Sequence, residues 1–320
     1  MDPQRLDIIL PTNVPWNASN LTRMENPEIS AGSRAILVAV IALQMVTGSV
    51  LNTLVILLFL LNVHLLQVPS NLIVFSLSSS DFISSSIFLP FHLYTVSSYR
   101  SRSVWVRKLD GSLAVLCFNA GINGILLLTG DRFLTVVGSM RYSSLVTLST
   151  TRCVLAMNWC IALTFSVLHF LLHHNSFYSD LFIAYNFSCL VIILFFYAAM
   201  FCSSQRQIQK IFSLEQAMGK SRVVMYKRLL KSIRASFGIV FVYVVTYFPF
   251  LLHFAIIGSS EKPVAQKSRA IVWSLTFVFW NSCVNPLLYC WLSKTFRVTI
   301  KRTFSCFVPT CLHRRVTFRK

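Results

Sequence analysis

The chain has 320 residues, of which 55% are hydrophobic and 12% are charged, and its formal net charge at pH 7 is +19. Soluble domains carry roughly a quarter charged residues, so this composition, with a mean hydropathy of +0.65, argues against a soluble domain. The positive charge alone would fit a nucleic-acid partner. However, the basic residues are concentrated between and beyond long apolar blocks, which argues against one.

Seven apolar blocks are long enough to cross a bilayer as helices, which takes about 20 residues each. They cover residues 35–63, 69–97, 110–136, 152–172, 180–204, 235–258 and 269–292. We therefore predict an all-α membrane protein. Its seven-transmembrane helix bundle would occupy residues 35–292, between an N-terminal segment, 1–34, and a C-terminal segment, 293–320.

Lysine and arginine gather on one side of the predicted spans, in 205–234 and after residue 292. Because basic residues are enriched in cytoplasmic loops, we expect the N-terminus outside the cell and the C-terminus in the cytoplasm of a multi-pass plasma-membrane protein. Residues 1–34 lack the apolar core of a cleavable signal peptide. They contain two sequons, at Asn17 and Asn20, which predict glycosylation on the outer face.

Asp81 lies deep in the second predicted span and follows a run of three serines, Ser78 to Ser80. A carboxylate inside hydrocarbon is costly and is usually functional or paired. Two interpretations stay open at this point. Asp81 belongs either to a functional site or to a structural hydrogen-bond centre formed with the neighbouring serines.

Two prolines fall within predicted spans, Pro249 in the sixth and Pro286 in the seventh. Proline removes a helix hydrogen bond and permits a kink. Asn285 precedes Pro286, and its side chain can bond the freed backbone groups. We therefore predict that the sixth and seventh helices can pivot.

The Asp131-Arg132 pair ends the third predicted span, either as a functional motif or as a topological anchor. After the seventh span, residues 293–300 alternate apolar and basic residues at helical spacing. This pattern predicts a short amphipathic eighth helix on the inner leaflet, rather than a solvated tail. Cys306 and Cys311 follow it, and we predict palmitoylation of one or both, with inert thiols as the alternative.

The order and spacing of these residues resemble the rhodopsin-like (class A) G protein-coupled receptors over residues 35–305. The matching residues are Asn52, Asn71, Leu77, Asp81, Asp131-Arg132-Phe133, Trp159, Tyr197, Phe248-Pro249, Asn285-Pro286-Leu287-Leu288-Tyr289 and Phe296. The resemblance implies a heterotrimeric G protein as partner and an extracellular ligand. It also implies that Arg132 turns toward Tyr197 and Tyr289 on activation.

The resemblance further implies a switch region and a polar network. The switch residues are Asp131, Arg132, Tyr197, Tyr247, Pro249, Asn285, Pro286 and Tyr289. The network residues are Asn52, Asp81, Asn281 and Asn285, with a sodium ion near Asp81 and no other cofactor implied. Catalytic or metal-binding spacing of His, Asp and Glu is absent from the sequence, so we do not expect an enzyme.

Several departures from the family pattern indicate a divergent, orphan or odorant-like member. Arg107 stands where a cysteine usually begins the outer disulfide, and Tyr247 replaces the sixth-span tryptophan. Gly121 takes the position of the sodium-site serine. Ala114 stands where amine receptors carry an aspartate, which disfavours a classical monoamine. The sixth span also lacks the acidic partner of Arg132.

Aromatic residues in the outer half of the predicted bundle favour an apolar or amphipathic ligand. They are Phe88, Phe91, Tyr94, Phe118, Tyr247, Phe250 and Trp273. The alternative is that these rings only pack between helices or meet lipid.

Three functions stay open: a ligand-activated receptor, a constitutively active or ligand-independent receptor-like protein, and a transporter or channel. The third is disfavoured, because Asp81 is the only acidic residue deep in a predicted span and no broken-helix pair is repeated.

Overall fold

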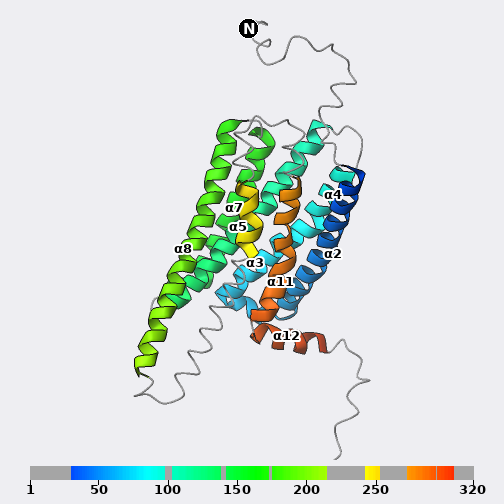
Figure 1. Cartoon of the computed structure of the whole chain (residues 1–320). Coiled ribbons are helices and arrows are strands. Elements are labelled where there is room, and N and C mark those ends of the chain that lie inside the picture. The colour runs from blue at the N-terminus through cyan, green and yellow to red at the C-terminus, as the bar shows by residue number, and fades with distance from the viewer. Residues whose placement is uncertain are drawn as a thin grey trace, which may run out of the picture.

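The computed structural model describes residues 30–97, 103–137, 142–172, 175–214, 242–252, 272–292 and 294–305. All regular secondary structure within these ranges is helical, and the helices form an elongated bundle (Figure 1). Several predicted sites lie outside the described residues: the glycosylation sites Asn17 and Asn20 and the acylation sites Cys306 and Cys311.

The first helix, α2 (Ala31–Leu61), begins after Ser30, whose hydroxyl accepts a 3.2 Å hydrogen bond from the Ser33 backbone amide. Such a serine N-cap satisfies an amide that has no partner within the helix. The helix ends at Asn62, whose side chain donates to the Leu58 carbonyl at 2.9 Å. A short 3₁₀ helix, η2 (Val63–Gln67), then leads into the second span.

The second span is one continuous helical rod of three segments, α3 (Pro69–Ile83), the π-helical turn η3 (Ser84–Phe88) and α4 (Leu89–Ser97). Its bounds agree with the predicted 69–97, but the π turn was not predicted. Pro90 supplies a physical reason, because its ring would clash with the carbonyl four residues earlier in a regular α-helix. A wider turn just before the proline relieves that clash.

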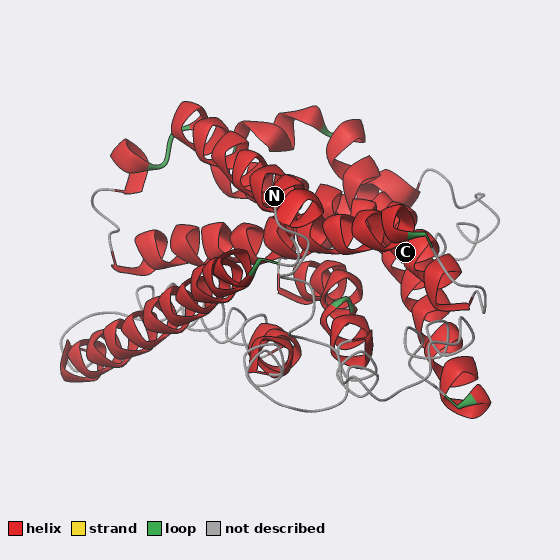
Figure 2. Cartoon of the chain, turned by 90° about the horizontal axis from the view of Figure 1, so that it is seen from above, coloured by secondary structure: helices red, strands yellow, loops and turns green. Residues whose placement is uncertain are grey.

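Three further long helices complete the part of the bundle that is described over its whole length. They are α5 (Val104–Val137), α7 (Leu148–Leu172) and α8 (Ser176–Leu214), with the short helix α6 (Tyr142–Leu145) between the first two. Each begins several residues before the predicted span. Of the five long apolar helices, α5 is the most enclosed, and it passes through the middle of the bundle (Figure 1). Figure 2 shows the helices of the bundle from above.

The predicted sixth span, 235–258, is described only over the helix Val242–Leu252. The seventh is helical over 272–278 and continues after Phe279 as α11 (Trp280–Leu292). Helix α12 (Lys294–Ser305) follows and lies crosswise at the end of the bundle (Figure 1). Phe296 fastens it, with ring centroids 6.1 Å from Phe59 and 6.4 Å from Tyr289. Its place at a membrane surface stays a prediction.

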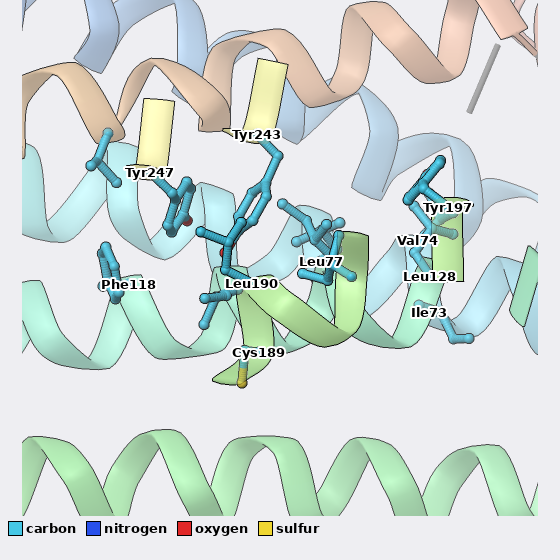
Figure 3. Packing of buried hydrophobic residues seen from close by; sticks show 14 of the residues in the cluster. Ile73, Val74, Leu77, Phe118, Leu128, Cys189, Leu190, Tyr197, Tyr243 and Tyr247 are labelled. Carbon is cyan, nitrogen blue, oxygen red and sulfur yellow. The ribbon is translucent and has the colours of Figure 1, made fainter. Parts of the chain in front are cut away.

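The core between the helices is apolar and aromatic, and Figure 3 shows part of it, with Phe118, Leu190, Tyr243 and Tyr247 packed together. A second, smaller cluster joins the N-terminal half of α2 to the C-terminal part of the second span and includes Leu37, Ile41, Phe88 and Phe279.

The outer surface of the bundle is apolar as well. Large side chains that are more than half exposed include Leu43, Met157, Leu163, Phe195 and Leu287. A soluble protein rarely exposes so much apolar surface, whereas a bilayer solvates it. Five of the described helices are long and apolar enough to cross a membrane. The architecture is therefore that of a multi-pass membrane protein.

Candidate functional site

Asp81 is the centre of a buried polar network between the second and seventh helices. One carboxylate oxygen accepts a 2.9 Å hydrogen bond from the Ser282 hydroxyl, and the other accepts one of 2.9 Å from the Asn285 side-chain amide. Both donors lie on α11, one turn apart. The carboxylate, only 4% exposed, therefore fixes α3 against α11.

Asn52 extends this network to the first helix. Its side-chain amide donates to the Gly48 carbonyl within α2 and to the Ser282 carbonyl on α11, both at 2.9 Å. Ser282 thus bonds Asp81 through its hydroxyl and Asn52 through its backbone, so three helices meet at one residue. The structure thus links the predicted residues Asn52, Asp81 and Asn285 through Ser282. Ser282 was not predicted, because a single serine within a span carries no distinguishing signal.

The fourth predicted member, Asn281, does not bond Asp81 in the described part of the chain. Its side chain lies near the hydroxyl of Tyr247 on the sixth helix. A Cβ added to Gly121 would stand 3.0 Å from the same hydroxyl. Tyr247 therefore occupies the space beside Gly121, where the family pattern has a serine.

The chemistry of the network fits a small hard cation. The side-chain oxygens of Asn52, Asn281 and Asn285 are buried and have no hydrogen-bond partner among the described residues. Together with the Asp81 carboxylate they form an oxygen-rich, net negative surrounding, which is what hard cations bind. Asp81, Asn281 and Asn285 would hold a sodium ion, whose charge would balance the carboxylate.

Asp131, near the C-terminal end of α5, is also a buried hydrogen-bond acceptor. Its two carboxylate oxygens accept from the Ser70 hydroxyl on α3 at 2.7 Å and from the Tyr142 hydroxyl on α6 at 2.8 Å. Burial raises the pKa of Tyr142 above its ordinary value, so this hydroxyl stays protonated and donates at neutral pH. Asp131 thereby ties three elements together at this end.

Asp131 and Arg132, although adjacent in the chain, form no ion pair within 4.0 Å in the described structure. The physical reason is geometric: Asp131 turns toward α3 and α6, where two hydroxyls neutralise it by hydrogen bonding. Arg132 lies near Tyr197 on α8 instead. The Tyr289 hydroxyl on α11 is buried and has no partner in the described structure.

Three of the predicted ligand residues, Phe118, Tyr247 and Phe250, form a packed aromatic cluster with Phe182. The Phe118 ring centroid is 4.9 Å from Tyr247, 5.0 Å from Phe250 and 5.8 Å from Phe182. The cluster connects α5, α8 and the sixth helix. Figure 3 shows two of its members, Phe118 and Tyr247. Movement of one of these helices would therefore displace the rings on the other two.

The remaining predicted ligand residues do not belong to this aromatic cluster. Tyr94 is 62% exposed and Trp273 is 37% exposed, so both lie on the outer surface. Phe88 is buried in the second core cluster, 4.7 Å from Phe279, and Phe91 is half-buried. The π turn explains Tyr94, because one extra residue in a turn rotates everything beyond it by about 100°.

A tether that sequence analysis missed joins the ends of α4 and α5. His92 Nδ1 lies 3.0 Å from an Asp110 carboxylate oxygen, to which the Thr95 hydroxyl also donates at 3.2 Å. The partly buried pair therefore holds the first turns of α5 against α4. All seven cysteines among the described residues are free.

Trp159 likewise has a defined place, because its indole N–H donates to the Ser76 hydroxyl at 3.1 Å and joins α7 to α3.

The features described here define a class: a helical membrane bundle with a buried carboxylate network and an Asp-Arg pair at one end, as in seven-helix receptors.

Comparison with known families places the chain more narrowly. Residues 51–289 match the family model of the 7 transmembrane receptor (rhodopsin family), and the chain belongs to this family. The prediction made from the order of the motifs is thus confirmed. The family consists of receptors, so the expectation that the chain is not an enzyme is confirmed as well.

Curated relatives are similar at low identity. Melanocortin receptor 5 of Rattus norvegicus is 21% identical over 214 residues, which cover 65% of this chain and 65% of that receptor. The chain therefore spans slightly under two thirds of that relative. The histamine H2 receptor of Rattus norvegicus is 25% identical over 255 residues, 74% of this chain and 70% of that receptor.

Proposed function

We propose that the protein is a receptor that transmits an extracellular signal to heterotrimeric G proteins through the Asp131 end of its bundle. The observation that carries this proposal is the arrangement around Arg132. Its neighbour Asp131 is bonded to Ser70 and Tyr142, and Arg132 itself makes no ion pair with another described residue. The guanidinium is therefore able to change partners when the helices move.

The mechanism is a shift between two arrangements of the helices. A ligand favours one arrangement only by its different affinity for the two. In the active arrangement, Arg132, which already lies near Tyr197, turns toward the Tyr289 hydroxyl, which has no partner among the described residues. Opening of the sixth helix at that end then uncovers the surface that binds the G protein.

The remaining switch residues connect the proposed ligand site to the Asp131 end of the bundle. Pro249 and Pro286 give the sixth and seventh helices places to pivot. Asn285 and Asp81 hold α11 against α3, and a sodium ion at Asp81 would strengthen the resting arrangement. Tyr247 transmits movement of the sixth helix to Phe118 through their ring contact.

The proposed orientation has an extracellular N-terminus and a cytoplasmic C-terminus in the plasma membrane. It rests on the distribution of lysine and arginine along the chain. Glycans at Asn17 or Asn20 and acyl chains at Cys306 or Cys311 stay predictions that agree with this orientation. The basic surface at the cytoplasmic end would meet the G protein.

The proposed ligand is apolar or amphipathic and enters above the cluster of Phe118, Phe182, Tyr247 and Phe250. Ala114, at the outer part of α5, offers no carboxylate for an amine. The two relatives named above take their names from different ligands, a melanocortin and histamine, so they do not select one for this chain.

A second candidate is a receptor that signals without a ligand. The observation that favours it is again Arg132, which no acidic side chain within 4.0 Å restrains in the described structure. A resting state with one restraint fewer is less favoured. A transporter or channel is the least favoured of the alternatives.

The experiment is expression of the full chain with dissociation sensors for each class of Gα subunit, without added ligand. We expect at least one sensor to respond in proportion to the surface level of the receptor. A response in no class at any surface level, with added apolar extracts also silent, would contradict G protein coupling.

A further inference from the structure

Tyr247 lies on the helix Val242–Leu252 and belongs to the aromatic cluster, with its ring centroid 4.9 Å from that of Phe118. Its hydroxyl lies near the Asn281 side chain and close enough to Asp81 to feel the charge of the carboxylate. The side chain is only 3% exposed. One buried residue therefore reaches both the aromatic cluster and the Asp81 network.

The Tyr247 hydroxyl fills a space that α5 leaves open at Gly121. A Cβ added to Gly121 would stand 3.0 Å from the hydroxyl oxygen, which is the one atom of another helix within 4 Å of that position among the described residues. A serine at position 121 would direct its own hydroxyl into the same space. In this chain the hydroxyl beside the Asp81 network is thus carried by the sixth helix and not by α5.

The Asp81 carboxylate can take a further partner. It accepts one hydrogen bond from Ser282 and one from Asn285, whereas a carboxylate has about four lone-pair positions. In the part of the chain that the structure describes, no basic side chain lies within 4.0 Å of it. A buried charge without an opposite charge is costly, so a cation beside Asp81 would stabilise it.

From this arrangement we infer that Tyr247 supplies a hydroxyl oxygen to a sodium ion at Asp81, in place of the serine that the family pattern has on α5. The oxygen of a tyrosine hydroxyl has lone pairs, and hard cations bind oxygen ligands. Asn281, beside this hydroxyl, adds a buried amide oxygen that has no partner in the described structure. The inference rests on the sodium site of the proposed function and adds a residue from the sixth helix to it.

A hydroxyl on the sixth helix changes which elements the cation site holds together. The hydrogen bonds of Asp81 by themselves join α3 to α11. With Tyr247 as a member, the site also holds the helix whose opening uncovers the proposed G protein surface. Because the Tyr247 ring contacts Phe118, a ligand that displaces this ring also withdraws the hydroxyl from the cation site.

The test is thermal melting of the purified full-length receptor in sodium chloride and in choline chloride at equal ionic strength, without ligand or G protein. Tyr247→Phe keeps the ring and removes the hydroxyl. It should raise the sodium concentration that gives half of the stabilisation by about tenfold or more, the order of one contact to a charged group.

Tyr243→Phe is the matched control. Tyr243 lies one turn away on the same helix, is fully buried, and has a hydroxyl without a partner among the described residues. Its substitution removes the same atom from the same helix at a position outside the Asp81 network. The sodium dependence of melting should therefore stay at the wild-type value.

A rescue variant separates a ligand from a packing role. Tyr247→Phe combined with Gly121→Ser returns a hydroxyl to the space from α5 and should recover most of the sodium affinity. Tyr247→Phe combined with Gly121→Ala adds the Cβ without the oxygen and should recover none. Recovery that is equal in the two double variants would overturn the assignment of the hydroxyl as a ligand.

The remaining outcomes distinguish this role from the site itself. A sodium response that is lost in Asp81→Asn but unchanged in Tyr247→Phe would overturn the role of Tyr247 alone. A wild-type receptor that sodium does not stabilise would overturn the sodium site and this role together. Because melting is measured without a G protein, a silent signalling assay would leave these results unaffected.

Discussion

At the scale of single residues, the Asp131 carboxylate receives hydrogen bonds from hydroxyls on two different elements. Ser70 and Tyr142 donate to it at 2.7 and 2.8 Å. A hydrogen bond to a buried charge is stronger than one between neutral groups. Loss of either donor, or of the charge, therefore loosens the C-terminal end of α5 from its neighbours.

Tyr142→Phe and Asp131→Asn should each raise the basal signal in cells, by roughly fivefold or more if the resting arrangement loses its usual coupling free energy. Both variants weaken the same contact, one from each side. Basal second-messenger levels at matched surface expression measure the effect. Tyr94→Phe is the control, since Tyr94 is 62% exposed, and basal signals that stay at the wild-type level in both variants would contradict this role of Asp131.

The Asp81 network leads to a prediction about sodium. Raising the sodium concentration at constant ionic strength, with choline replacing it in the control, should raise the melting temperature of purified wild-type receptor by about 2–4 °C. Asp81→Asn removes the charge that holds the cation and should abolish the difference. A sodium effect of equal size in wild type and Asp81→Asn would exclude a site at this carboxylate.

Much of the network was predictable from sequence, but its partners were not. Asn52, Asp81 and Asn285 stood out because polar groups inside apolar spans are costly and need a reason. Ser70, Tyr142 and Ser282 carry hydroxyls that occur throughout the chain. Their roles depend on the relative height and rotation of neighbouring helices, which periodicity does not specify.

At the scale of elements, the second span shows where a sequence pattern predicts a helix but not its register. The bounds Pro69 and Ser97 were predicted, whereas the π turn at Ser84–Phe88 was not. The turn rotates the residues beyond it, so Tyr94 faces outward and Phe88 joins the core beside Phe279. A proline indicates a disturbance of the helix without indicating which form it takes.

Helix α2 passes the same π turn at very close range. A Cβ added to Gly48 would lie 2.8 Å from the Ser85 Cβ, so Gly48→Ala should force the two helices apart and lower the free energy of unfolding by about 1–3 kcal/mol. Thermal melting in detergent measures this. Gly32→Ala is the control, because a Cβ there meets nothing within 4 Å.

The double variant Gly48→Ala with Ser85→Gly restores the space and should recover most of the lost stability. If Gly48→Ala melts at the wild-type temperature, the close approach of α2 to η3 is not a constraint on the fold.

At the scale of the whole molecule, the class of fold was the most predictable feature. An apolar block of about 20 residues is a strong signal, because a spanning helix must satisfy its backbone internally and meet lipid on its outer face. The family match over residues 51–289 confirms this reading. The aromatic ligand wall was the least predictable feature, since lipid-facing and core-facing aromatics look alike in a sequence.

The orientation of the molecule gives a separate prediction. An epitope tag before residue 1 should bind antibody on intact cells, and glycosidase treatment should increase the mobility of the protein on a gel. The mobility change should disappear in the double variant Asn17→Gln, Asn20→Gln. Staining that requires permeabilised cells, although the protein is at the surface, would reverse the proposed orientation.

The central claim is that Arg132 transmits the state of the bundle to a G protein. Nucleotide exchange on purified Gα, catalysed by the receptor without added ligand, measures this most directly, with wild type and Arg132→Ala at equal receptor concentration. The account predicts that wild type accelerates exchange and that Arg132→Ala lowers the acceleration by about 5- to 150-fold, with surface expression of the variant in cells largely unchanged. Equal acceleration by wild type and Arg132→Ala would contradict it.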